Sequence, residues 1–358
     1  MKTEEEVRMK SAHLGCGPRA RRHAEAYEFV QNGEIGAICD LDEARLEAFG
    51  RDFHVDSEHR YTDVREMLEM ERPDVLDIVT APTIRVDLMR MAADYEVPVV
   101  IVEKPVAVQG EDYRQIKALN ETSDTHFVVN TQLHFHRQNL ELKRYVAEGR
   151  IGELRFLDAS ARSTILDQGV HVLELAYTYN GGAAPVRVFG QVSGVENLRV
   201  PAECPAGVGY QPSPDIAEAA IQFENGVRAQ LLSGHIAPRA TDHETIYAHK
   251  RIAVYGTEGF VHWTMYGWER FTPENGYERG VSDYGYEDVR AQAALMDAAF
   301  EWASDDEKQH PTRLELNLEQ FSIILATYAS ALTARAVDLP FDPPEGMLDG
   351  LRTRLQPH

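Results

Sequence analysis

The chain has 358 residues, of which 43% are hydrophobic and 26% charged, and its formal net charge is −22. This length allows two domains with separate cores, and the negative charge disfavours nucleic acid and anionic membrane surfaces as partners. The N-terminus is charged and has no apolar core, and no apolar stretch reaches the about 20 residues of a membrane span. With three cysteines that lack metal-type spacing, these features predict a cytoplasmic protein.

The first part of the chain alternates short apolar runs with amphipathic segments. Strands are expected at 9–14, 35–40, 74–80, 97–103 and 126–132. Helical patterns lie between or beside them, at 19–30, 41–49, 64–70, 84–96 and 111–121. This alternation predicts βαβ units, and therefore an α/β domain built on a parallel sheet with right-handed crossovers.

The second part begins with a helical pattern and then becomes rich in strands. A helix is expected at 139–149, followed by strands within 153–161, 186–194, 216–234 and 251–266, and by helices near 287–304 and 315–337. Asn225-Gly226 predicts a tight hairpin turn, because these residues adopt positive φ angles easily. Consecutive hairpins predict an α+β domain with a mainly antiparallel sheet, and we place the boundary between domains 1–130 and 131–358.

A glycine-rich turn joins the first expected strand to the first helix. Gly15, Gly17, Pro18, Arg19 and Ala20 fit the pattern G-x-G-x-x-A, in which glycines allow close backbone approach and the helix N-terminus faces a pyrophosphate. A plain turn is the alternative for such a motif taken alone. Its position between a strand and a helix near the chain start favours a dinucleotide-binding Rossmann domain.

Two further strand ends are expected beside this turn. Asp40 ends the second strand, where a carboxylate can accept hydrogen bonds from a ribose 2′-hydroxyl and repel a 2′-phosphate; its alternative role is a helix N-cap. Thr80 and Pro82 follow the third strand, and Pro is also common at the first position of a helix. Asp40 favours NAD over NADP as cofactor, whereas Arg19 and Arg21 favour NADP.

Two groups of titratable residues, far apart in the sequence, can contact the same ligand. The apolar strand at 97–103 ends in Glu103, Lys104 and Pro105, at the edge where open α/β sheets bind ligands; a solvated Lys is the alternative. Asp167 and His171 share one helix face at i and i+4, or form an N-cap and a buried His. Oxidation of an alcohol needs a base, for which His is suited, and a cation can stabilise the developing oxyanion.

His134 and His136 form a second polar group at the entrance to the second domain. On a strand, their i, i+2 spacing would place both rings on one face. A zinc pair is conceivable, but no third ligand is indicated by spacing, so we expect no metal. We interpret the two residues as candidate substrate contacts.

The residues quoted so far resemble the Gfo/Idh/MocA family of oxidoreductases. The similar pieces, in family order, are LGCGPRARRHAEAY, ICDLDEARLEAF, VEKPVAV, GRIGELRF, LDQGVHVLEL, SPDIAEAAIQFENGVRAQ and VYGTEGFV. The resemblance implies that Lys104 is catalytic, that Glu103 and Pro105 shape the nicotinamide end, that His171 is the acid/base, and that Asp167 orients it or holds a substrate hydroxyl. It also implies an open second sheet that forms homodimers or homotetramers.

Three departures from the family pattern bear on the substrate. Arg85 follows the Thr80 turn where many members have His, and His134 replaces a usual Arg. The stretch 161–165 is short where relatives often carry a long loop, which predicts an open pocket; Arg162 within it is a candidate substrate contact. We expect an NAD-dependent dehydrogenase of a sugar, polyol or sugar derivative. A redox-neutral NAD-dependent glycosidase or lyase and a non-catalytic dinucleotide sensor are the alternatives.

Overall fold

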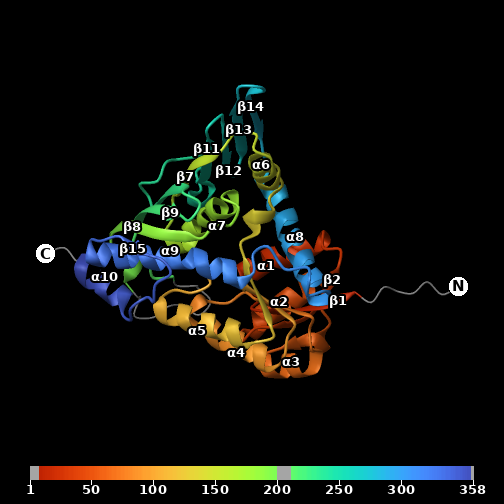
Figure 1. The fold of residues 1–358 in the computed structure, drawn as a ribbon. Coiled ribbons are helices and arrows are strands. Elements are labelled where there is room, and N and C mark those ends of the chain that lie inside the picture. The colour runs from red at the N-terminus through yellow and green to blue at the C-terminus, as the bar shows by residue number, and fades with distance from the viewer. Residues whose placement is uncertain (1–7, 200–210, 356–358) are drawn as a thin grey trace.

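The first sheet is parallel and has the strand order of a doubly wound dinucleotide-binding fold. A computed structural model describes residues 8–199 and 211–355 of the chain (Figure 1). Across the sheet the strands are β3 (Arg60–Tyr61), β2 (Gly33–Cys39), β1 (Met9–Leu14), β4 (Val75–Ile78), β5 (Val99–Glu103) and β6 (His126–Asn130). Every neighbouring pair is parallel. The order reverses between β1 and β4, which is where such sheets bind ligands.

The predicted α/β architecture of this part is confirmed, with small differences in extent. The helices are α1 (Pro18–Glu25), α2 (Glu43–Asp52), α3 (Val64–Glu71), α4 (Arg85–Asp94) and α5 (Gly110–Thr122). All five residues of β5 are buried, as a strand covered on both faces requires. The short edge strand β3 was not expected. The strand predicted at 126–132 ends at Asn130, and the chain continues as a 3-10 turn, η4 (Gln132–Phe135).

The second sheet is larger and mainly antiparallel, as predicted. Its order is β14 (Gly276–Val281), β13 (Gly267–Thr272), β12 (Phe260–Thr264), β11 (Lys250–Gly256), β7 (Leu154–Ala161), β10 (Arg228–Ser233), β9 (Ile216–Phe223), β8 (Pro185–Ser193) and β15 (Val337–Asp338). One pair, β7 with β10, is parallel. The predicted hairpin joins β9 to β10, and Gly226 supplies its positive φ of 82° while Asn225 is not among the described residues with positive φ.

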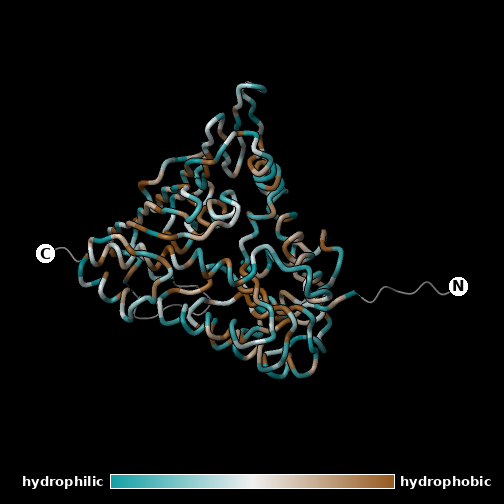
Figure 2. The backbone as a smooth tube through the Cα atoms, viewed as in Figure 1, coloured by the Kyte–Doolittle hydropathy of each residue, from teal (hydrophilic) through white to brown (hydrophobic). Residues whose placement is uncertain are grey.

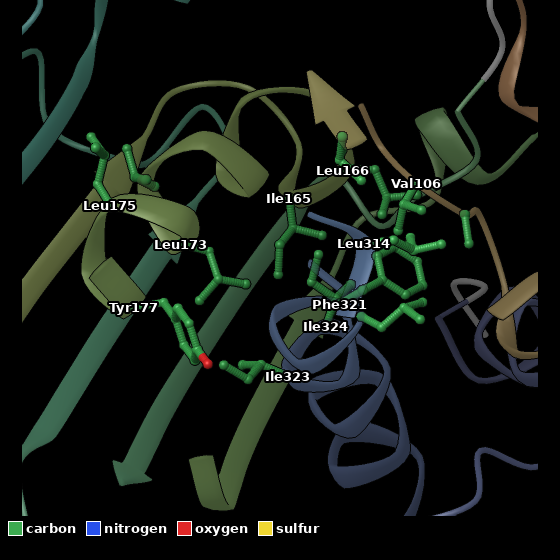
Figure 3. Close-up of a cluster of buried hydrophobic side chains, with 14 of the residues drawn as sticks. Val106, Ile165, Leu166, Leu173, Leu175, Tyr177, Leu314, Phe321, Ile323 and Ile324 are labelled. Carbon is green, nitrogen blue, oxygen red and sulfur yellow. The ribbon is translucent and has the colours of Figure 1, made fainter. Parts of the chain in front are cut away.

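Helices cover one face of the second sheet and form its core. The helices of this part are α6 (Arg137–Ala147), α7 (Val170–Tyr179), α8 (Tyr284–Ser304), α9 (Leu314–Thr333) and α10 (Met347–Leu355); α6, α7 and α9 contact the second sheet, and α10 packs on α9. Figure 3 shows Leu173 and Tyr177 of α7 beside Ile323 of α9, in front of the sheet. Ile165 and Leu166, which precede α7, are fully buried in the same cluster. Buried apolar residues that precede and follow Asp167 in the sequence therefore fix the segment that carries it.

Helix α8 links the two sheets. It leaves the end of β14, runs back toward β1 and β2 (Figure 1), and contacts α1, β4 and β5. Its Leu295, Met296 and Phe300 are fully buried in one cluster with Val99 and Ile101 of β5. Hydrophobic segments lie mainly inside the molecule, and hydrophilic ones follow its outside (Figure 2). Since residues after 131 complete the core of the first sheet, the boundary at 130 remains a prediction.

Candidate active site

A cavity of about 990 Å³ opens at the carboxyl ends of the first sheet's strands. Residues from α7, β11 and α8 close it from the other side. Of the residues predicted from the sequence, it is lined by Gly15, Gly17, Pro18, Arg19, Asp40, Thr80, Pro82, Glu103, Lys104 and His171. The remaining predicted residues are not among those that line it: Ala20, Pro105, His134, His136, Arg162 and Asp167. One cavity thus joins the glycine-rich turn to Lys104 and His171.

The glycine-rich turn is shaped by two glycines with different requirements. Gly15 has a φ of +102°, and a Cβ there would lie 2.5 Å from the carbonyl oxygen of Val79, so any other residue would be strained. A Cβ on Gly17 would meet no protein atom within 4 Å. Pro18 begins α1, and Ala20 is buried in the core beneath the helix. The turn can therefore admit a pyrophosphate at the start of α1.

Asp40 is held in place by the glycine-rich turn. Its carboxylate accepts hydrogen bonds from the backbone N–H of Cys16 and of Asp42, each at 2.8 Å, and lies 3.4 Å from the guanidinium of Arg45. The N-cap of α2 is Asp42, which accepts from the N–H of Arg45 at 3.0 Å. The alternative role for Asp40, that of N-cap, is therefore wrong.

Glu103 belongs to a buried ionic network beneath the turn. One of its carboxylate oxygens accepts from Arg19 at 2.7 Å, from His23 at 2.8 Å and from Asn130 at 2.7 Å. The other nitrogen of His23 donates to Asp77 at 2.7 Å. Although burial opposes both charges, Arg19 and His23 hold the pKa of Glu103 well below its usual value, and Asp77 with Glu103 raises the pKa of His23 to about 9.

Lys104 is directed across the cavity into the second half of the chain. Its Nζ donates to the backbone oxygen of Asp167 at 2.8 Å and to a carboxylate oxygen of the same residue at 3.1 Å. Asp167 also accepts from Ser163 at 2.6 Å and from Gln168 at 2.9 Å. Burial raises the pKa of Asp167, but Lys104 and these donors outweigh it and lower that pKa. The alternative of a freely solvated Lys104 is wrong, and Asp167 is placed to position its ammonium group.

His171 lines the cavity as a buried imidazole. It lies in α7, one turn after Asp167, which sits in a π-helical turn, η5 (Ile165–Gly169), rather than in the regular helix predicted. π-Turns of this kind often occur at functional sites. Burial first, and then the charges of Lys104 and Lys250, hold the pKa of His171 well below its ordinary value. The imidazole is therefore neutral near pH 7, the state in which it can accept a proton.

The two other predicted histidines point elsewhere. They do not share a strand face, because His134 is in η4 and His136 caps α6. His134 contacts the carboxylate of Glu174 at 2.7 Å, and His136 is fully buried between Trp263 and Tyr284. The geometry does not bring either residue to the cavity, so neither enters the function proposed below.

Arg162 likewise lies outside the cavity lining. Its guanidinium donates to the backbone oxygen of Ala237 at 3.3 Å. Within residues 8–199 and 211–355, no three His, Cys, Asp or Glu side chains are grouped as a metal ion would require, and in the same ranges no helix is long and apolar enough to cross a membrane. Cys204 and the first seven residues lie outside those ranges. The cytoplasmic location remains a prediction.

Several cavity residues were not identified from the sequence. Lys250 begins β11, and its Nζ donates to the Gln168 side chain at 2.7 Å and to the backbone oxygen of Tyr247 at 2.8 Å. Arg85, noted only as a departure from the family, is buried; its guanidinium donates to the backbone oxygens of Thr80, at 3.1 Å, and of Pro105. Burial lowers the pKa of Arg85 to about 10.

Helix α8 contributes a polar stripe to the cavity that the sequence could have suggested. Tyr284, Asp288 and Gln292 all line the cavity. They are four residues apart and so share one face of a helix, and Gln292 is buried. A polar stripe of this kind on a largely apolar helix was the available signal. The sequence does not indicate which other element this face of the helix approaches.

The chain resembles known oxidoreductases over most of its length. Residues 9–131 match the model of the oxidoreductase family with an NAD-binding Rossmann fold, and residues 158–262 match the Gfo/Idh/MocA C-terminal domain. The chain is 26% identical over 274 residues to a D-apiose dehydrogenase of Paraburkholderia graminis, covering 70% of this chain and 66% of that protein. A D-apiose dehydrogenase of Rhizobium rhizogenes is 25% identical over 369 residues, covering 92% and 97% respectively.

A solved structure agrees with the fold described above. An oxidoreductase from Agrobacterium radiobacter, in complex with NAD+, L-tartaric acid and magnesium, superposes with a TM-score of 0.76 at 24% identity, over 93% of this chain and 98% of that one. The two family models together match more than half of the chain, and they do so in the order of the two sheets. The chain therefore belongs to the Gfo/Idh/MocA family of NAD-binding Rossmann-fold oxidoreductases.

Proposed function

We propose that this chain is an NAD-dependent dehydrogenase that interconverts a CH–OH group and a carbonyl in a sugar, polyol or sugar derivative. The observation that carries the proposal is the meeting of Lys104 and a neutral, buried His171 in the cavity that also contains the glycine-rich turn. The relatives named D-apiose dehydrogenase support a sugar-like substrate. NAD, when bound, supplies the acceptor for the hydride.

Each residue of the site would have a distinct role in binding or catalysis. Gly15, Gly17 and Pro18 would hold the pyrophosphate at the start of α1. His171 would take the proton of the substrate hydroxyl, and Lys104 would hold the same oxygen and stabilise its developing negative charge. Asp167 would act as a positioning residue, because it contacts the ammonium of Lys104. In the direction of reduction, the same proton would return from His171.

Asp40 is the residue that we expect to select NAD over NADP. Of the two arginines that favoured NADP, Arg19 is bound to Glu103 and Arg21 to Asp52, while Asp40 lines the cavity. Replacing Asp40→Ser removes like-charge repulsion toward a 2′-phosphate and leaves Arg45 paired with Asp42 alone, at 3.3 Å. We expect kcat/KM for NADP relative to NAD to rise at least about 10-fold.

The matched control for this change is Asp42→Ser. Asp42 is the neighbouring N-cap and is not among the residues that line the cavity. We expect Asp42→Ser to cost at most about 1 kcal/mol of stability without altering the cofactor ratio. An unchanged ratio in Asp40→Ser would contradict the role given to this carboxylate.

The activity itself is tested with NAD and a panel of sugars, polyols and sugar acids. We expect NADH to form with at least one class of compound in the panel. Its formation is measured by the absorbance of NADH. Release of a leaving group from aryl glycosides without net NADH would instead favour the redox-neutral reaction. Tight NAD binding with neither result across the panel would favour a sensor.

The assembly of the chain is proposed from its second sheet. The face of β8 opposite α9 carries Phe189, whose exposed fraction is 45%, and Phe271 of β13 is also exposed. Exposed aromatic residues on a broad sheet are typical of protein–protein contacts. We propose that the chain forms a homodimer or homotetramer through this sheet. Sedimentation analysis measures the mass of the assembly directly.

A further inference from the structure

The side chain of Lys250 is a buried amine that faces the cavity, and no carboxylate of the described residues pairs with it. Only 3% of the residue is exposed, and it lines the same cavity as Lys104 and His171. Its hydrogen-bond acceptors are an amide oxygen of Gln168 and the backbone oxygen of Tyr247, both neutral. An ammonium group carries three N–H donors, so one remains for a ligand. Buried charges in proteins are normally paired.

The other charged groups around the cavity are already engaged. Lys104 is paired with Asp167, and Arg19 with Glu103. Arg85 donates to the backbone oxygens of Thr80 and Pro105. Within the described part of the chain, Lys250 makes no ion pair shorter than 4.0 Å. Among the described residues it is therefore the amine at this end of the cavity to which the chain supplies no counter-ion.

Asp288 also lines the cavity, and within residues 8–199 and 211–355 it has no ion-pair partner. It accepts from the Gln132 side chain at 3.1 Å, and it is not paired with Lys250. Burial lowers the pKa of Lys250 to about 7; the charges of Lys104 and Arg19 add to this lowering, and those of Asp288 and Asp167 oppose it. Two cations and two carboxylates therefore act on Lys250, and neither carboxylate lies within ion-pair distance of its Nζ.

We propose that Lys250 binds a carboxylate of the substrate, and that the substrate is a polyhydroxy acid such as a sugar acid. The inference rests on the dehydrogenase function proposed above, whose substrate class it narrows. The carboxylate would accept the free N–H of Lys250, while the hydroxyl to be oxidised lies at Lys104 and His171. A carboxylate beside this amine would favour its protonated form and accept its N–H, whereas a neutral sugar would supply no counter-ion.

Gln168 connects this binding point to the catalytic end of the cavity. Its amide oxygen accepts from Lys250, and its amide nitrogen donates to Asp167 at 2.9 Å. Asp167 in turn accepts from Lys104. A carboxylate at Lys250 therefore orders the amide that helps to hold the positioning residue of Lys104. Recognition of the acid and placement of the catalytic ammonium share one chain of hydrogen bonds.

The test compares D-gluconate with D-glucitol, which differ only in a carboxylate against a CH₂OH group. Binding is measured by calorimetry on enzyme saturated with NADH, so that no hydride acceptor is present and neither probe turns over. We expect the wild-type enzyme to bind gluconate at least about 10-fold more tightly than glucitol. Lys250→Met should remove this preference without weakening glucitol binding to the same extent.

Lys143→Met is the matched control. Lys143 is a half-buried lysine whose Nζ donates to the backbone oxygen of His134 at 3.0 Å, and it does not line the cavity. Its replacement removes the same charge from the chain and should keep the preference for gluconate. Lys250→Gln serves as a second variant if Lys250→Met unfolds, and thermal denaturation checks both.

Two results would overturn the inference. One is a wild-type enzyme that binds the two probes equally or binds neither; the other is a Lys250 variant that keeps the full preference for gluconate. The dehydrogenase proposal is judged separately, by NADH formation across the panel. NADH formed from neutral sugars with no gluconate preference would remove the sugar-acid inference alone. A gluconate preference without NADH formation from any panel member would remove the dehydrogenase alone.

Discussion

Replacement of Lys104 by Met is expected to lower turnover at least about 100-fold while NAD binding stays nearly unchanged. The side chain is placed to hold the reacting oxygen, and removal of its ammonium takes away charge stabilisation that is needed only during the reaction. The fold should tolerate the change. Asp167 keeps Ser163 and Gln168 as donors, and its side chain is 39% exposed.

The measurement is steady-state kinetics with the best substrate of the panel, together with NAD titration. Lys117→Met is the control, because Lys117 lies on α5 with 53% of its side chain exposed. We expect that control to behave as wild type. Equal turnover in Lys104→Met and wild type would show that Lys104 has no catalytic role. A parallel loss of turnover and NAD binding would instead indicate a structural role.

Replacement of His23 by Gln is expected to cost about 3–5 kcal/mol of the free energy of unfolding, the usual effect of removing one partner from a buried ionic network. His23 is fully buried and bridges Asp77 and Glu103. A neutral amide leaves both carboxylates without their shared cation. Since Glu103 also holds Arg19 of the glycine-rich turn, NAD binding should weaken as well.

The pH dependence of this effect has a definite sign. Because the pKa of His23 is raised in the folded protein to about 9, its contribution is fully present below the ordinary value of about 6.5 and is lost as pH rises through about 9. Urea unfolding of wild type and His23→Gln should therefore differ most near pH 6 and least above about pH 9.

The control for this second prediction is His235→Gln, at an exposed position. It should match wild type at every pH. A stability difference between wild type and His23→Gln that stays constant across this range would mean that His23 is neutral in the folded protein. The network would then be held by hydrogen bonds without the imidazolium charge.

The first sheet could be predicted because its signals are local. Continuous Val and Ile runs identify β5 and its neighbours, and the glycine-rich turn sits where β1 passes into α1. The edge strand β3 has two residues, too few to produce a pattern. In the second sheet, the hairpin of β13 and β14 was not predicted. The residues of β14 are alternately half-buried and exposed, so this strand has no buried apolar face to produce a pattern.

The candidate site was predictable only where a motif marks it. Lys104 and His171 follow from a strand end and a helix face. Lys250 does not, because a Lys at the start of a strand is usually solvated; one of its contacts is Gln168 of η5, which lies 82 residues earlier in the chain. Asp167 and His171 were expected in one regular helix, and the π-turn that contains Asp167 has no local sequence signal. Long-range packing, which a single sequence does not display, decides these positions.

The central claim is that a hydride passes between substrate and nicotinamide in the cavity formed by Lys104 and His171. The most direct test incubates the enzyme and NAD with carbon-deuterated members of the sugar and sugar-acid panel, and determines the mass of the recovered cofactor. We predict NADH carrying one deuterium with wild type, and a loss of this transfer of at least about 100-fold in Lys104→Met. Recovery of unlabelled NAD from every incubation, with NAD binding intact, would contradict the account.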